Sequence, residues 1–187
     1  VVALTAGEQS YDVDGVMAAA GTIDLAWLET LLDHPFFRRL PPKTTGREVF
    51  GTGMAHKMVA EGQARGLNGD NIIATLTALT AQSIALAYEQ FAPQPVAEVI
   101  LGGGGRHNRR MVDLLSDLLA PAQVRTHEDL GIDGDFKEAL VFAVLAHETW
   151  HNRPGNLPVQ TGATHPAVLG QITPGRNYAD LLRKTWG

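Results

Sequence analysis

A run of four glycines, Gly102 to Gly105, is the part of this sequence whose residue types point most directly to chemistry. It lies between a β-branched apolar run that ends at Leu101 and a segment, 107–119, with apolar residues at helical spacing. Glycines at a strand-to-helix junction leave no Cβ to obstruct a ligand, and the free N–H groups of a helix start favour polar ligands. The pattern favours a nucleotide site; the alternative is a tight turn that binds nothing.

Two familiar phosphate-binding motifs do not fit this loop. A dinucleotide-binding fingerprint needs a third glycine where His107 and Asn108 stand. A P-loop needs Gly-Lys-Ser/Thr, and Arg106 followed by His107 takes that place. The loop could therefore cover a nucleoside without a lysine that grips phosphate.

Two carboxylates form the second candidate for a ligand-binding site. Asp135 and Glu138 are three residues apart, so they share a face at the start of a helix expected over 135–151. The helix dipole stabilises negative charge there. Asp135 could be the N-cap with Glu138 as its reciprocal partner, or a carboxylate could accept hydrogen bonds from sugar hydroxyls, and the two readings are compatible. Residues 139–146 are apolar on every face, which predicts a largely buried helix.

Two further groups of residues give weaker signals. Lys43 and Thr44 open a segment, 43–47, whose two cations and two hydroxyls could meet phosphates or form a solvated turn. His147 and His151 are four residues apart but lack a His-Glu-x-x-His arrangement, so they are interpreted as packing and surface residues rather than metal ligands. No Ser-His-Asp or Cys-His pattern is evident.

Periodicity and breakers predict the elements that carry these residues. Residues 34–37 and Pro41-Pro42 should break helical structure, and Thr45 to Glu48 has the spacing of a capping box. Asp24 and Asn68 are expected to cap the helices that follow them. Helices are expected over 1–7, 24–33, 54–64, 71–91, 107–119 and 135–151, parallel strands over 96–101 and 123–126, and irregular chain over 153–175. This indicates a mainly helical part, 1–92, and an α/β part, 93–187.

Composition excludes several classes of protein. A net charge of −5 argues against a general nucleic-acid binder, and the absence of cysteine fits a reducing compartment. No signal peptide and no unbroken apolar run of membrane-spanning length is apparent, so neither export nor a membrane partner is supported. The chain begins with Val1 in what reads as mid-helix, which suggests a fragment of a longer protein.

Five motifs in order resemble the C-terminal half of the anhydro-N-acetylmuramic acid kinase family, and together they run through essentially the whole chain. They are residues 11–15 (Tyr-Asp-Val-Asp-Gly), 41–48 (Pro-Pro-Lys-Thr-Thr-Gly-Arg-Glu), 101–108, 131–139 and 154–163. The resemblance implies an RNase H-like, actin-like α/β domain of a two-domain kinase in the hexokinase–Hsp70–actin superfamily. It also implies ATP and Mg²⁺, cleavage of the 1,6-anhydro ring by water, and transfer of phosphate to O6. The product is N-acetylmuramic acid 6-phosphate, an intermediate of cell-wall recycling in the cytoplasm.

Carried over to this sequence, the resemblance assigns roles to particular residues. It makes Glu138 a sugar-binding carboxylate and places Lys43 and Thr44 near the nucleotide. The adenosine-side loop would comprise Gly102, Gly103, Gly104 and Gly105, with Asn108 behind it. The family's catalytic aspartate and its first phosphate loop match positions before Val1, so no catalytic or metal-binding residue is expected here. The partner implied is the N-terminal half of the same kinase, and a homodimer is left open.

Two alternatives stay open at this point. The chain could be a non-catalytic nucleotide- or sugar-binding module, because the glycine loop by itself implies only binding. It could also come from a different sugar kinase of the same superfamily, because that loop is widely shared and only the other motifs narrow the substrate.

Overall fold

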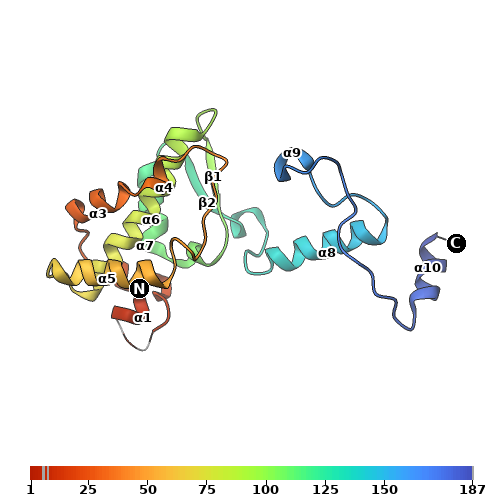
Figure 1. The fold of residues 1–187 in the computed structure, drawn as a ribbon, viewed down its shortest axis with the longest axis horizontal. Helices are drawn as coiled ribbons and strands as arrows, with labels where there is room; N and C mark the ends of the chain where they lie inside the picture. The colour runs from red at the N-terminus through yellow and green to blue at the C-terminus, as the bar shows by residue number, and fades with distance from the viewer. Residues whose placement is uncertain (6, 8, 187) are drawn as a thin grey trace. The chain divides into compact units, whose positions relative to one another are not determined.

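The computed structural model describes residues 1–5, 7 and 9–186, and the chain forms two compact units, Val1–Gly134 and Asp135–Gly187 (Figure 1). The boundary expected at 92/93 follows the change from helices to strands. The structural boundary lies elsewhere because the helices before residue 92 pack against the helix that follows the glycine loop. Each unit is described by itself below.

A long central helix organises the first unit. This helix, α6 (Gly69–Phe91), packs against α2 (Val16–Ala20), α3 (Leu25–Leu32) and α7 (Arg109–Leu119). The core residues Trp27, Leu28, Leu31, Met58, Ile72, Ala78 and Leu79 are all buried. The expected caps are confirmed, since Asp24 accepts a hydrogen bond from Trp27 N (2.9 Å) and Asn68 accepts one from Asn71 N (2.8 Å).

The predicted parallel α/β unit is confirmed. Strands β1 (Glu98–Leu101) and β2 (Gln123–Thr126) pair in parallel, with Glu98 opposite Gln123 and Leu101 opposite Thr126, and α7 connects them. A β-branched apolar run that ends at a glycine loop is typical of a buried parallel strand, but in β1 only Val99 is buried, and Ile100 is 43% exposed. The described residues form a sheet of only two strands, so β1 pairs with β2 along one edge and its other edge has no strand partner among them.

Short elements complete the first unit. They are α1 (Val2–Thr5), η1 (Val13–Gly15), α4 (Pro35–Arg38), α5 (Thr52–Ala64), η2 (Gly104–His107) and η3 (Glu128–Leu130). Of the helix expected over 1–7, Val2–Thr5 is helical and residue 6 lies outside the described residues.

Two local expectations in the segment 34–51 are met in part. Helix α3 ends at Leu32, before residues 34–37, but Pro35 then starts the single turn of α4, where its missing N–H costs nothing. The capping-box spacing at Thr45 predicts a helical turn, and the amides of Val49 and Phe50 close one onto Gly46 O (3.2 and 3.0 Å). This turn does not continue into α5, which begins after Gly51 without a side-chain cap.

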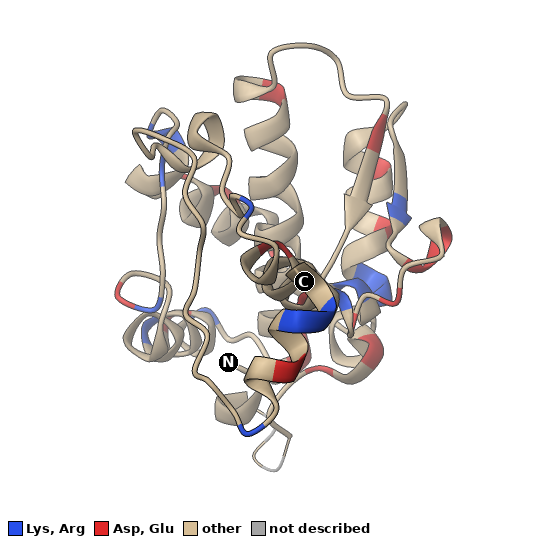
Figure 2. Ribbon diagram, turned by 90° about the vertical axis from the view of Figure 1, so that its right-hand side faces the viewer, with Lys and Arg blue, Asp and Glu red and all other residues tan. Residues whose placement is uncertain are grey.

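Helix α6 is long and apolar enough to cross a membrane by length and composition. Only Asp70 and Glu89 carry charge on it, so most of its ribbon is tan in Figure 2. Its apolar residues, however, form the core of the first unit, as those of a core helix do.

The second unit contains α8 (Lys137–Trp150), α9 (Pro158–Thr161) and α10 (Tyr178–Trp186). The segment 153–175 is irregular as predicted, apart from the single turn of α9. The prediction of a largely buried α8 was wrong, because Leu140, Val141, Phe142 and Val144 are 49 to 70% exposed. Residues 169–172 share a pocket with one side of α8, and the apolar side chains on its other sides have no covering layer among the described residues of this unit.

Candidate nucleotide site

The glycine loop leaves β1 at its carboxyl end and opens to solvent. Gly103 has φ 77° and ψ 178°, a backbone conformation that side chains with a Cβ rarely adopt. An added Cβ at Gly103 or Gly104 would have no protein atom within 4 Å. The loop therefore offers bare backbone and open space, the property that the sequence predicted for close approach of a ligand.

Asn108 connects the loop to a second segment. Its side chain caps α7 by accepting a hydrogen bond from Met111 N (3.0 Å). Gly15 approaches so closely that a Cβ there would lie 2.2 Å from Asn108 Oδ1. Asp12 holds this turn by accepting hydrogen bonds from the backbone N–H groups of Met17 (2.9 Å) and Ala18 (3.0 Å). The start of α7 and the turn 11–15 thus form one packed unit.

A pocket of about 590 Å³ lies between this turn and the glycine loop. Its lining is Tyr11, Asp12, Val13, Asp14, Gly104, Gly105, His107 and Asn108. The volume is in the usual range for small-molecule sites. Because the lining contains two carboxylates but neither lysine nor arginine, it suits hydroxyl groups better than phosphates.

Sequence reasoning missed the two aspartates of this pocket. The sequence identifies residues 11–15 only as one of five family motifs, whereas in the structure Asp14 has a positive φ of 54°. Such a conformation is costly for a residue other than glycine and gathers at functional sites. The pairing of aspartates around a single apolar residue was the signal available in the sequence.

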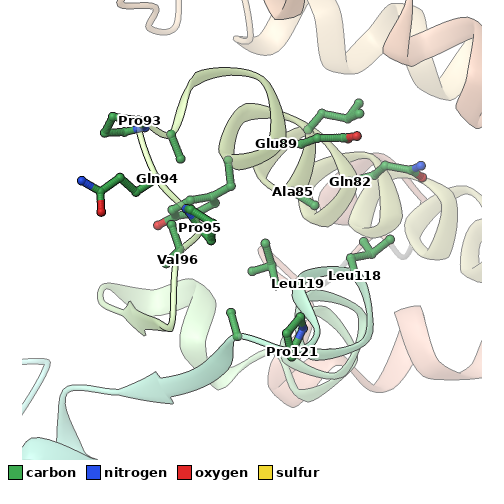
Figure 3. Close-up of a pocket in the computed structure, with 14 residues that line it drawn as sticks. Gln82, Ala85, Glu89, Pro93, Gln94, Pro95, Val96, Leu118, Leu119 and Pro121 are labelled. Atoms are coloured by element: carbon green, nitrogen blue, oxygen red, sulfur yellow. The ribbon is translucent and has the colours of Figure 1, made fainter.

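A slightly larger pocket of the first unit lies elsewhere. It measures about 660 Å³ and lies between the C-terminal ends of α6 and α7 and the segment 92–96 (Figure 3). These segments lead into β1 and β2, whereas ligands in parallel α/β sheets bind beyond the carboxyl ends of the strands. The smaller pocket at the glycine loop is therefore the better candidate.

The structure places Lys43 outside this pocket. Its ammonium donates hydrogen bonds to the carbonyls of Phe36 (3.3 Å) and Phe37 (3.0 Å) and lies 4.6 Å from the ring centroid of Phe91. These contacts anchor the segment before α5 on the aromatic side chains around α4. Thr44 is exposed beside it. The nucleotide-side role expected for Lys43 and Thr44 stays a prediction.

Glu138 lies exposed in the first turn of α8. The capping-pair interpretation places Asp135 at the N-cap, but the N-cap of α8 is Phe136, whose side chain makes no capping hydrogen bond. Glu138 is then the second helical residue rather than the third, which is the position that a capping box requires. The sugar-binding interpretation of Glu138 is the one still open.

The paired histidines lie on the last turn of α8. The ring centroids of His147 and His151 are 4.2 Å apart with the ring planes tilted by 41°, and His147 also contacts Glu148 and Arg153. Across residues 1–5, 7 and 9–186, no group of three or more His, Asp or Glu side chains is placed to hold a metal ion.

Comparison with known proteins decides the family. A family model described as anhydro-N-acetylmuramic acid kinase matches residues 2–175. The chain belongs to this kinase family. Curated family members named anhydro-N-acetylmuramic acid kinase are 42% identical over 172 residues in Trichormus variabilis and 39% identical over 172 residues in Caldanaerobacter subterraneus. These matches cover 92% and 91% of this chain.

The chain spans less than half the length of these relatives. The matches cover 44% of the Trichormus variabilis kinase and 43% of the Caldanaerobacter subterraneus kinase. A third anhydro-N-acetylmuramic acid kinase, from a Cyanothece species, gives the same picture, with 41% identity over 90% of this chain and 44% of the relative. The match falls on the C-terminal part of the family's kinases.

Proposed function

We propose that this chain is the nucleotide-binding, C-terminal half of an ATP-dependent kinase that acts in the cytoplasm on 1,6-anhydro-N-acetylmuramic acid. Family membership supports the kinase activity and the substrate. The observation that carries the nucleotide role is the pocket between the turn 11–14 and the glycine loop. An RNase H-like, actin-like domain fold is part of the proposal, and the parallel β1–α7–β2 unit is consistent with it.

The residues of the pocket suit the nucleoside end of ATP. The backbone of Gly103 and Gly104 is open to a flat ring or a ribose, because no side chain intervenes. Asp14 lines the same pocket and would accept hydrogen bonds from ribose hydroxyls. Asn108 holds the start of α7 in place behind the loop.

The proposed reaction divides its chemistry between two halves. Water opens the anhydro ring, and the O6 that is released takes the γ-phosphoryl group of ATP. Phosphoryl transfer depends mostly on positioning and charge stabilisation, and Mg²⁺ bound with ATP would supply charge neutralisation. This half would position adenosine and, through Glu138, part of the sugar. The base that activates the water belongs to the N-terminal half.

The exposed face of α8 supports the N-terminal half of the kinase as a partner of this chain. Leu140, Phe142 and Val144 form an apolar surface within the second unit that is unusual for a protein surface in water. Relatives are more than twice as long as the matched region. We therefore expect the N-terminal half of the kinase to cover α8.

Replacing Asp14 with asparagine should weaken adenosine binding by roughly tenfold, the value of one charge-assisted hydrogen bond. Asparagine tolerates the positive φ of this position, so the turn should persist. Calorimetry with adenosine and 2′,3′-dideoxyadenosine would measure the effect, which should vanish for the dideoxy compound. Asp113→Asn, an exposed carboxylate on α7 outside this pocket, is the control. An equal loss for both ligands would contradict a ribose contact.

Replacing Glu138 with glutamine in the complete kinase should raise the sugar KM or lower kcat, with ATP affinity unchanged. The thermal midpoint should stay the same, because Glu138 is the second residue of α8 and not the third, which is the capping-box position. Steady-state kinetics and thermal melts on the same variant separate the two effects. A lower midpoint with normal kinetics would show that Glu138 is only structural.

Calorimetric titration of the chain with ATP tests the proposal as a whole. We expect adenosine to retain most of the affinity of ATP, because the pocket lining contains neither lysine nor arginine. Binding of ATP by the complete protein with no phosphorylation of the anhydro sugar would favour a non-catalytic module. Phosphorylation of another sugar in preference to it would favour a different kinase.

A further inference from the structure

Arg106 is a buried cation in an otherwise exposed loop. Its side chain is 3% exposed, whereas Gly102, Gly103, Gly104 and Gly105 are all exposed. A buried charge is costly unless it is paired and hydrogen-bonded. The guanidinium meets this need by donating from Nη1 to the carbonyl of Gly103 (2.9 Å) and from Nε to Glu128 Oε1 (2.8 Å).

Glu128 ties this arginine to the segment that follows β2. The same oxygen, Oε1, contacts Arg106 Nη2 at 2.8 Å and accepts a hydrogen bond from Gly134 N (3.1 Å). A Cβ at Gly134 would lie 2.8 Å from the guanidinium carbon, so the backbone there fits closely around the ion pair. The Arg106 guanidinium lowers the pKa of Glu128 from 4.5 to about 2, so the pair stays ionised at acidic pH values where an ordinary glutamate would be protonated.

We propose that Arg106 and Glu128 are positioning residues that hold the glycine loop in its nucleotide-binding conformation. The inference rests on the proposed function, in which this loop receives adenosine. Four consecutive glycines lose more conformational freedom on ordering than any other residues would. A loop ordered before the ligand arrives avoids that loss during binding. The bond from Arg106 to Gly103 O fixes the loop at the glycine with the unusual backbone angles.

The sheet provides a matched control pair. Arg125 Nη1 lies 2.7 Å from Glu98 Oε1 and bridges β1 and β2, whereas Arg106 and Glu128 join the two segments that follow these strands. The side chains of Arg125 and Glu98 are 36 and 39% exposed. Among the described residues, neither Arg125 nor Glu98 makes a hydrogen bond to the glycine loop. Its loss tests the effect of removing an ion pair from this unit without releasing Gly103.

The experiment compares Glu128→Ala and Glu98→Ala in the full chain by hydrogen exchange without ligand and by calorimetry with ATP. For Glu128→Ala we expect faster amide exchange confined to residues 102–106 and a Kd for ATP raised roughly tenfold or more. Glu98→Ala should match the unaltered chain in both loop amide exchange and the Kd for ATP. Arg106→Lys, which keeps the charge but loses the planar fork, should reproduce the loop exchange of Glu128→Ala.

Three results would overturn the inference. They are unchanged loop exchange in both Glu128→Ala and Arg106→Lys, equal effects of Glu128→Ala and Glu98→Ala, and an unchanged Kd despite a released loop. Should Glu128→Ala fail to fold, Glu128→Gln and Arg106→Lys carry the same comparison. If the unaltered chain binds no ATP, the proposed function fails, and the exchange data still decide whether this pair holds the loop.

Discussion

Replacing Gly104 with valine should abolish nucleotide binding while leaving the chain folded. A Cβ at Gly104 meets no protein atom within 4 Å, so the new side chain would point into the space proposed for the nucleoside. Its backbone lacks the positive φ of Gly103, so valine adds no comparable strain. We expect the Kd for ATP to rise roughly 100-fold or more, as for a clash that costs several kcal/mol. Calorimetry and circular dichroism on the same sample check binding and folding.

Gly53→Val is the matched control for this substitution. Gly53 lies in α5, also has open space around an added Cβ, and does not line the pocket at the loop. It should leave ATP affinity unchanged. Gly103→Val is a poorer test, because its φ of 77° strains any side chain. Native circular dichroism with undiminished ATP affinity in Gly104→Val would show that the nucleotide binds elsewhere.

The chain by itself should bind nucleotide but show no kinase turnover. The pocket at the glycine loop lacks a lysine or arginine for phosphates, and the described residues gather no metal-binding group. General-base assistance is typically worth about 10²–10⁴-fold in rate, and a missing phosphate cradle removes further charge stabilisation. Exclusion of bulk water also needs the second domain.

The assay incubates this chain with ATP, Mg²⁺ and 1,6-anhydro-N-acetylmuramic acid and measures N-acetylmuramic acid 6-phosphate. The full-length kinase of Trichormus variabilis, 42% identical over the shared region, is the positive control. Adding the N-terminal half of that kinase should restore activity if the two halves associate. Turnover by the chain alone within about tenfold of the control would show that the catalytic base lies in these residues. Loss of the base should lower the rate by more than about tenfold.

The sequence by itself determined what depends on neighbours within a few residues. Asp24 and Asn68 cap the helices that follow them as predicted, because a capping bond spans only three residues. The strand over 123–126 has its predicted bounds, and the helix after the glycine loop forms where apolar spacing placed it. The open backbone at Gly103 and Gly104 also follows from residue type alone, since neither has a Cβ.

Only the tertiary structure decided which distant residues share a site. It brought Asp12 and Asp14 to the pocket at Gly104, although most of the first unit lies between these aspartates and Gly104 in the sequence. It also buried Arg106 against Glu128 and engaged Lys43 with backbone carbonyls. Such contacts depend on how α6 and α7 pack together, and the local spacing of residue types in the sequence does not predict that packing. Helix α8 shows the same limit, because its composition predicts burial but burial requires a covering partner, which the described residues of its own unit do not provide.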